Sequence, residues 1–201
     1  LWPGVLEAFR LIGSEQIQGR ASLGGNLCNG SPAGDSVPAL IAAGCKAVIA
    51  GPGERKEIPI ENFHLGPGKT ILENGQMLVS LKFPKRNKNS SDAYLRMTPR
   101  TEMDIAVVGC GVNISMDNGI CTDARVSLGA VAPTPLLIKE ATEIMIGSNL
   151  DENTLDEVSK ICMDACNPID DKRGTIEYRT KVAGVLFKRT TNIAIDRIIG
   201  N

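Results

Sequence analysis

The segment between Arg20 and Asp35 has the residue types of a phosphate-binding loop. Within it, residues 22–26 read Ser-Leu-Gly-Gly-Asn. A phosphate needs several converging backbone N–H donors, and glycines allow this because no Cβ obstructs the approach and positive φ is accessible to them. The Ser22 hydroxyl and the Asn26 amide add polar contacts. The segment therefore predicts a backbone cradle for a phosphate in an irregular loop.

Asp35 follows Asn26 closely enough in sequence to serve the same ligand. A carboxylate placed there can accept hydrogen bonds from the hydroxyls of a sugar or a ribityl chain. The segment has neither the G-x-G-x-x-G pattern of a Rossmann turn nor the lysine of a Walker A loop. The residues alone leave a second interpretation open, in which this is a glycine-rich connection and Asp35 caps a helix that begins at Val37.

The other residues with reactive side chains predict structural roles. The single histidine, His64, lies in an expected loop beside Gly-Pro-Gly at 66–68, which excludes multi-histidine metal sites and disfavours a Ser-His-Asp triad. The six cysteines are scattered, and the nearest pair, Cys162 and Cys166, has the spacing of a helix face rather than of a cluster or zinc motif. We expect the pair to pack, and the protein to lie in the reducing cytoplasm.

Composition narrows the classes of partner. The chain of 201 residues has a formal net charge of -1, with basic and acidic residues interspersed. Nucleic acid and anionic lipid require a basic face, which this pattern does not predict. The apolar run at 105–108 is far too short for a membrane span. A small-molecule or protein partner is therefore favoured. Because the chain starts at Leu1, inside an amphipathic pattern, we expect further coding sequence upstream.

The first half mixes short helices and strands. Apolar spacing predicts helices at 5–12 and 37–43 and strands at 46–50, 54–58 and 76–83. The first two strands flank Gly-Pro-Gly and should form a hairpin. The segment 84–91 is polar, basic and unpatterned, so we expect a surface loop there and a domain boundary near residue 88.

The second half begins with strands and ends with helices. Asn118-Gly119 between apolar runs is a strong hairpin signal. Expected elements are strands at 109–116 and 120–128, then helices at 136–146, 151–165 (with Leu155, Val158 and Ile161 on one face) and 175–199. Strands followed by a run of helices indicate the α+β class.

Residues 16–35 carry a family resemblance. They read Q-I-Q-G-R-A-S-L-G-G-N-L-C-N-G-S-P-A-G-D, which is similar to the second flavin motif of molybdenum hydroxylases, Q-I-R-N-x-A-T-[IL]-G-G-N-[IL]-x-x-[AG]-[ST]-P-x-[AS]-D. Further similar stretches lie at 63–70, 100–108, 124–135 and 178–179. The whole chain thus resembles the FAD-binding medium subunit of the xanthine dehydrogenase and carbon monoxide dehydrogenase family. Ser22 replaces the usual Thr but keeps the hydroxyl, and Gln18-Gly19 stands where Arg-Asn is usual.

The resemblance implies a fold and a set of site residues. Residues 1–87 would be the second half of a PCMH-type FAD-binding domain, and 88–201 a C-terminal α+β domain, an antiparallel sheet with helices, of the CO dehydrogenase flavoprotein type. Ser22, Gly24, Gly25 and Asn26 would hold the FAD pyrophosphate, Leu27 would pack near the flavin, Asp35 would bind hydroxyls of the cofactor, and Lys82 would lie near the isoalloxazine edge.

Two of these assignments have plain structural alternatives. Lys82 could be a solvated strand lysine. The loop at 98–104 resembles one near the outer face of the flavin that influences access of the final electron acceptor. For Arg100 and Asp104 in that loop, an intramolecular salt bridge is an equal alternative to a flavin role.

The resemblance also implies partners and an electron path. A molybdopterin-binding large subunit would oxidise the substrate, [2Fe–2S] clusters on a small subunit would relay electrons, and FAD would pass them to NAD, oxygen or a quinone. No catalytic acid or base and no metal ligand is then expected in this oxidoreductase subunit. The first flavin motif of the family, an Ala-Gly-Gly-Thr/His-like loop, is not found in the sequence. We expect it upstream, and expect this chain alone to retain FAD weakly. A stand-alone flavin oxidoreductase, or a non-catalytic interaction module that has lost FAD, are the alternatives.

Overall fold

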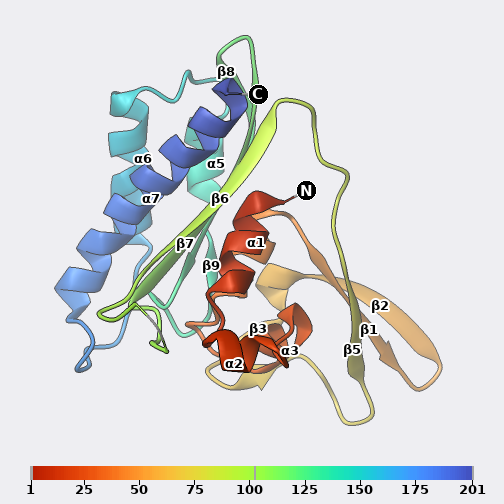
Figure 1. Ribbon diagram of the computed structural model, residues 1–201. Coiled ribbons are helices and arrows are strands. Elements are labelled where there is room, and N and C mark those ends of the chain that lie inside the picture. Colours follow the sequence, from red (N-terminus) through yellow and green to blue (C-terminus); the bar gives the residue numbers. More distant parts are fainter. Residues whose placement is uncertain (1, 102, 201) are drawn as a thin grey trace.

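The computed structural model describes residues 2–101 and 103–200, which form three separate sheets and the helices that pack around them (Figure 1). The elements are α1 (Pro3–Arg10), α2 (Glu15–Gln18), α3 (Leu23–Cys28), α4 (Ser36–Ala42), β1 (Lys46–Gly51), β2 (Glu54–Pro59), η1 (Ile60–Asn62), β3 (His64–Gly66), β4 (Lys69–Thr70), β5 (Met77–Lys82), β6 (Ser90–Met97), β7 (Val108–Asp117), β8 (Ile120–Gly129), β9 (Leu136–Leu137), α5 (Lys139–Met145), α6 (Glu152–Asp164) and α7 (Ile176–Ile199). The α+β class is thereby confirmed. None of the described helices is long and apolar enough to cross a membrane.

The first half contains a small antiparallel sheet in the order β2-β1-β5. The predicted hairpin is present, with Ala50 opposite Arg55 in the β1–β2 register. The strand expected at 76–83 pairs with the other edge of β1 as β5. This sheet extends away from the rest of the molecule, and α3 lies near its β5 edge (Figure 1).

The glycine-rich segment is not an irregular loop throughout, so that expectation was wrong. Residues 23–28 form the short helix α3, and Ser22 accepts a hydrogen bond from the Gly25 amide as its N-cap. Two glycines disfavour a helix by about 1 kcal/mol each. A serine cap and packing of the helix on β5 supply compensating stabilisation.

His64 lies in strand β3 and not in a loop, which corrects its expected setting. The imidazole is buried, and its Nε2 lies 2.7 Å from the Leu27 carbonyl oxygen. This contact holds the C-terminal end of α3 to the β3–β4 ribbon. The structural role predicted for His64 is confirmed.

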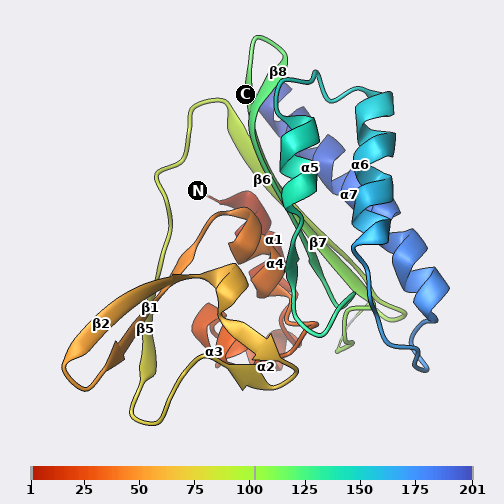
Figure 2. The ribbon, with the colours of Figure 1, turned by 180° about the vertical axis from the view of Figure 1, so that it is seen from behind.

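The second half is built on a four-stranded antiparallel sheet in the order β6-β7-β8-β9. The predicted hairpin is confirmed: Asn118 and Gly119 both have positive φ, 47° and 81°, as a tight turn between right-twisted strands requires. Helices α5, α6 and α7 cover one face of this sheet, while α1 and α4 lie against the other (Figure 2).

The C-terminal helices differ from expectation in two details. The helix predicted at 136–146 begins only at Lys139, because Leu136 and Leu137 extend as an edge strand paired with β8. On α6, Cys162 is buried beside Leu155 and Val158, whereas Ile161 is only half-buried. Cys162 follows Val158 by four residues and Ile161 follows it by three. The helical period of about 3.6 residues is closer to four, so Cys162 faces the core more directly. The helices expected at 151–165 and 175–199 are present as α6 and α7, with Asp151 and Thr175 as their N-caps.

The two halves pack closely against each other. The Val5 amide at the start of α1 donates a 3.2 Å hydrogen bond to Asp92 Oδ2 on β6. A Cβ added at Gly111 on β7 would lie 2.6 Å from the Pro38 carbonyl oxygen on α4. Glycine is therefore required for this approach. The domain boundary near residue 88 falls in the segment between β5 and β6 and stays a prediction.

Candidate functional site

The N-terminus of α3 presents polar groups at the surface. Ser22 Oγ accepts the Gly25 amide at 3.0 Å, and both residues are exposed. The amides of Leu23 and Gly24, in the first turn, have no acceptor within the helix. A hydroxyl and backbone N–H groups at the positive end of the helix dipole form an environment suited to an anion.

The two glycines of α3 also permit tight packing. A Cβ at Gly24 would lie 3.3 Å from Leu78 Cδ2 on β5, and one at Gly25 would lie 3.1 Å from Ser22 Oγ. Larger residues would displace the helix from the sheet or disturb its cap. Leu27, on the inward side of the same helix, is fully buried in the core.

Asn26 connects α3 to α4. Its Oδ1 accepts hydrogen bonds from the Ser36 amide at 3.1 Å and from Ser36 Oγ at 2.7 Å. Asp35 precedes α4 but its side chain makes no capping hydrogen bond. The interpretation of Asp35 as the cap of this helix is therefore wrong, because Asn26 does the capping and leaves the Asp35 carboxylate for other contacts.

The Asp35 carboxylate is held by two residues of β6. Asp35 is 8% exposed, and its Oδ2 lies 2.8 Å from Arg96 Nη1, while its Oδ1 accepts the Tyr94 hydroxyl at 3.3 Å. Burial raises the pKa of Asp35, and the Arg96 guanidinium opposes this rise. Arg96 also donates to the Leu11 carbonyl oxygen at 2.9 Å, which joins β6 to the end of α1.

Sequence reasoning missed Arg96 and Tyr94 as residues of this site. Alternation along β6 places Tyr94 and Arg96 on one face. A buried strand that carries an arginine in such a row indicates a carboxylate partner. The sequence does not indicate which of the acidic residues is that partner.

A cavity of about 310 Å³ lies beside Asp35. Asn26, Asn29 and Asp35 line one side, and the segment from Met103 to Ile105 lines the other. A second, mainly apolar cavity of about 340 Å³ shares Ser31, Ala33 and Ile105 with it, so the two cavities are neighbours.

The structure thus brings only part of the predicted set together. Asn26 and Asp35 face the same cavity, and Ser22, Gly24 and Gly25 lie one turn away on α3. Lys82 lies apart on β5, where its exposed ammonium is 2.6 Å from Glu57 Oε1. This ion pair favours the alternative of a solvated strand lysine.

The loop that includes Arg100 and Asp104 is held by ionic contacts. Asp104 Oδ2 accepts the Arg100 amide at 3.2 Å and lies 3.6 Å from Arg100 Nε. Asp104 Oδ1 lies 3.7 Å from Arg173 Nε. The intramolecular salt bridge anticipated for this pair is present, and Arg173 ties the loop to the segment before α7.

The cysteines show packing rather than ligand geometry. Cys162 is fully buried, and the Cys166 thiol lies 3.1 Å from the Cys162 carbonyl oxygen. Within 2–101 and 103–200, no three His, Cys, Asp or Glu side chains are grouped as metal ligands would be.

Two family models match the chain. Residues 2–86 match the family described as FAD binding domain in molybdopterin dehydrogenase, and residues 93–194 match the CO dehydrogenase flavoprotein C-terminal domain. The chain is 30% identical over 194 residues to the xanthine dehydrogenase FAD-binding subunit of Escherichia coli O157:H7. It is 32% identical over 193 residues to the carbon monoxide dehydrogenase medium chain of Afipia carboxidovorans. Each alignment covers 96% of this chain and 66% of the relative.

A solved structure is similar over the same extent. Carbon monoxide dehydrogenase from Hydrogenophaga pseudoflava, in a form lacking the Mo-pyranopterin moiety of its cofactor, superimposes with a TM-score of 0.91 at 30% identity. The match covers 95% of this chain and 66% of that one. The two family models match successive segments of the chain, and the second segment alone contains half of its residues. The chain therefore belongs to the FAD-binding medium subunits of the xanthine and carbon monoxide dehydrogenase family.

Proposed function

We propose that the chain binds FAD between the N-terminus of α3 and the cavity beside Asp35. The observation that carries this proposal is that the serine-capped start of α3 lies one turn from Asn26, which lines a cavity together with the buried Asp35. Ser22, Gly24, Gly25 and Asn26 would hold the pyrophosphate. Asp35 would accept hydrogen bonds from hydroxyls of the cofactor, and Leu27 would pack near the flavin.

The residues around this cavity are compatible with bound FAD. A Cβ at Gly34 would lie 3.3 Å from Asn26 Oδ1 and 3.2 Å from Val37 Cγ2, so the wall of the cavity depends on glycine. The exposed surface at Gly25 likewise lets a phosphate approach the backbone. Lys82 has the weakest support, because a role at the isoalloxazine edge would require it to leave Glu57.

We propose further that the subunit transfers electrons within a molybdenum-containing hydroxylase or dehydrogenase. Bound FAD would supply the redox chemistry for electron transfer between a partner and an acceptor. The residues of this chain bind and orient it and set the charge around it. The proposed partners are a molybdopterin-binding large subunit and a [2Fe–2S] small subunit, with NAD, oxygen or a quinone as acceptor. The 93–194 match to the medium-subunit domain supports this over a stand-alone flavin oxidoreductase.

The test is the flavin content of the full-length protein co-purified with its partner subunits. We expect flavin absorbance in the wild type and its loss in Gly24→Val and Asp35→Ala. Gly66→Val is the matched control, because nothing lies within 4 Å of a Cβ at Gly66. A complex that carries no flavin, and that takes up none in an anaerobic FAD titration, would overturn the proposal in favour of a non-catalytic module.

A further inference from the structure

The sheet β6–β9 has two chemically different faces. Rows of directly opposed residues point to the same side, and successive rows alternate. The apolar rows, such as Ala93-Val112-Val126, belong to the core shared with the C-terminal helices. Two rows on the opposite face are polar: Ser90-Ser115-Asp123 and Asp92-Asn113-Arg125.

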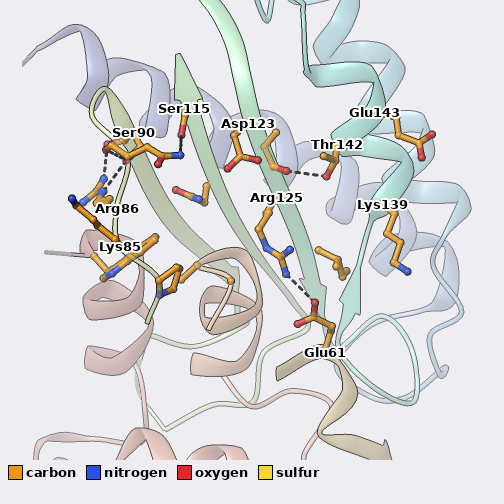
Figure 3. Close-up of a pocket in the computed structure, with 18 residues that line it drawn as sticks. Glu61, Lys85, Arg86, Ser90, Ser115, Asp123, Arg125, Lys139, Thr142 and Glu143 are labelled. Atoms are coloured by element: carbon orange, nitrogen blue, oxygen red, sulfur yellow. Dashed lines mark hydrogen bonds and ion pairs between the residues drawn. The ribbon is translucent and has the colours of Figure 1, made fainter. Parts of the chain in front are cut away.

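Only one end of the polar face is covered by α4. Pro38 on α4 packs against Gly111 and Gly129, where added Cβ atoms would come within 2.6 Å. At the other end, the polar rows form the floor of a cleft of about 660 Å³. Its walls are the segment from Pro84 to Asn87 on one side and α5 on the other (Figure 3).

Two buried acceptors in this cleft have no hydrogen-bond partner in the described chain. They are Asn113 Oδ1, on a residue only 8% exposed, and Glu61 Oε2. Arg125, opposite Asn113 in the register, donates from Nη2 to the other Glu61 oxygen at 3.0 Å and from Nε to the Ile41 carbonyl oxygen. A buried acceptor left unpaired is costly, which indicates a ligand that brings N–H or O–H donors.

Two lysines line the mouth of the cleft. Lys85 and Lys139 stand on opposite walls (Figure 3), both are exposed, and the described residues form no ion pair with either. Four basic side chains line the cleft against three acidic ones, and one of the basic residues, Arg125, is paired with Glu61. An anionic group at the mouth would therefore be attracted, while donors on the same ligand reach the floor.

We propose that this cleft binds a nucleoside phosphate whose base carries an amino group. The amino group would donate to Asn113 Oδ1 and Glu61 Oε2, and the phosphate would reach Lys85 or Lys139. The volume lies in the usual range for small-molecule sites. The cleft shares no lining residue with either cavity beside the flavin site, so this inference stands independently of FAD binding.

The test is isothermal titration of the full chain with AMP. AMP is part of FAD and can also enter the proposed FAD site, so we expect one AMP site per chain that persists in Gly24→Val, with adenosine and inorganic phosphate each binding there at least tenfold more weakly. Asn113→Leu should weaken AMP at least tenfold without lowering the melting temperature, because it replaces an unpaired acceptor by an apolar group. Lys139→Ala should weaken AMP several-fold and reduce its salt dependence. Lys160→Ala, an exposed lysine on α6 outside the cleft, should change nothing.

Three results would overturn the proposal. The first is no AMP binding at millimolar concentration, and the second is binding that Asn113→Leu leaves unchanged. The third is phosphate binding as tightly as AMP, which would reduce the site to an anion site. If AMP fails and the cleft gains hydrogen-exchange protection only with partner subunits present, the cleft is a protein interface instead.

Discussion

The Asp35 carboxylate and the Arg96 guanidinium lie 2.8 Å apart, although 61 residues separate them in the chain. The side chains of Arg96 and Asp35 are 6% and 11% exposed. A buried pair of this kind adds little net stability, but losing one partner leaves an uncompensated charge. Arg96 therefore fixes the position and the ionisation of a proposed cofactor ligand from the other half of the molecule.

Arg96→Met should lower the free energy of unfolding by about 3 kcal/mol at pH 7. Without the guanidinium, burial raises the pKa of Asp35 further above its ordinary value. The folded variant then binds a proton more readily than the unfolded chain, so its stability should rise as pH falls toward that raised pKa. Urea unfolding at pH 7 and pH 5 measures both effects.

The control for this substitution is Arg100→Met, because Arg100 is 70% exposed in its ion pair with Asp104. Arg100→Met should lower the free energy of unfolding by less than about 1 kcal/mol. This loss should not become smaller at pH 5, because the substitution leaves the environment of Asp35 unchanged. If Arg96→Met shows the same small, pH-independent change, the buried pair does not have the role assigned to it.

Ser22→Ala should destabilise the chain by about 1 kcal/mol and weaken FAD, because the hydroxyl caps α3 at its first turn. Ser14→Ala is the matched comparison, since Ser14 precedes α2 without a side-chain capping bond. Urea unfolding gives the first effect and flavin titration of the full-length complex the second. Equal behaviour of the two variants would argue against the cap.

Gly111→Ala should destabilise the chain by about 2 kcal/mol, because its Cβ would meet the α4 backbone at the Pro38 carbonyl. Thermal unfolding reports the loss. Gly66→Ala, where nothing lies within 4 Å of the new Cβ, should be close to neutral. An unaffected Gly111→Ala would mean that α4 and β7 do not approach as closely as described.

Arg179→Lys should destabilise the chain by about 3 kcal/mol even though it keeps the charge. The Arg179 guanidinium is buried and donates to the carbonyl oxygens of Val107 and Ala130 and to Asp171 Oδ1, at 2.7, 3.3 and 2.8 Å. A lysine ammonium cannot span these acceptors in one plane. Arg189→Lys, exposed on the same helix, should be neutral in the same melting experiment.

A thiol reagent at pH 8 should modify Cys28 rapidly in the native protein and the other thiols slowly. Cys28 is exposed, although partial burial raises the pKa of its thiol, whereas burial raises the pKa of the Cys45 and Cys110 thiols to about 12. Only the thiolate reacts, so burial slows the reaction both by raising the thiol pKa and by blocking access of the reagent. Cys28→Ser should remove the fast phase, and all six thiols should react in denaturant. A fast phase that persists in Cys28→Ser would contradict this ordering.

Local signals predicted much of the fold. Asn118-Gly119 predicted a hairpin because both positions need positive φ, and the starts expected at 151 and 175 lie within one residue of those of α6 and α7. The helix α3 was missed because glycine content argued for a loop, while its cap and its packing on β5 outweigh propensity. Leu136 and Leu137 were assigned to a helix because the pairing with β8 is not visible in their own spacing.

The candidate site was predictable in composition but not in arrangement. The motif at 16–35 named Asn26 and Asp35, and both line the cavity. The partners of Asp35 come from β6, and a single sequence contains no information about contacts at that separation. For the same reason, the role of Asn26 as the cap of α4 could not be anticipated.

Asp35 lies in the segment 2–86 that matches one family, and Arg96 lies in the segment 93–194 that matches the other. A chimera joined between these segments would combine a carboxylate from one parent with a strand from another. Such a recombinant would be compatible only where the donor strand also supplies a cation at the position of Arg96. The two family segments are thus constrained to change together at this pair, even though they are separate units of sequence.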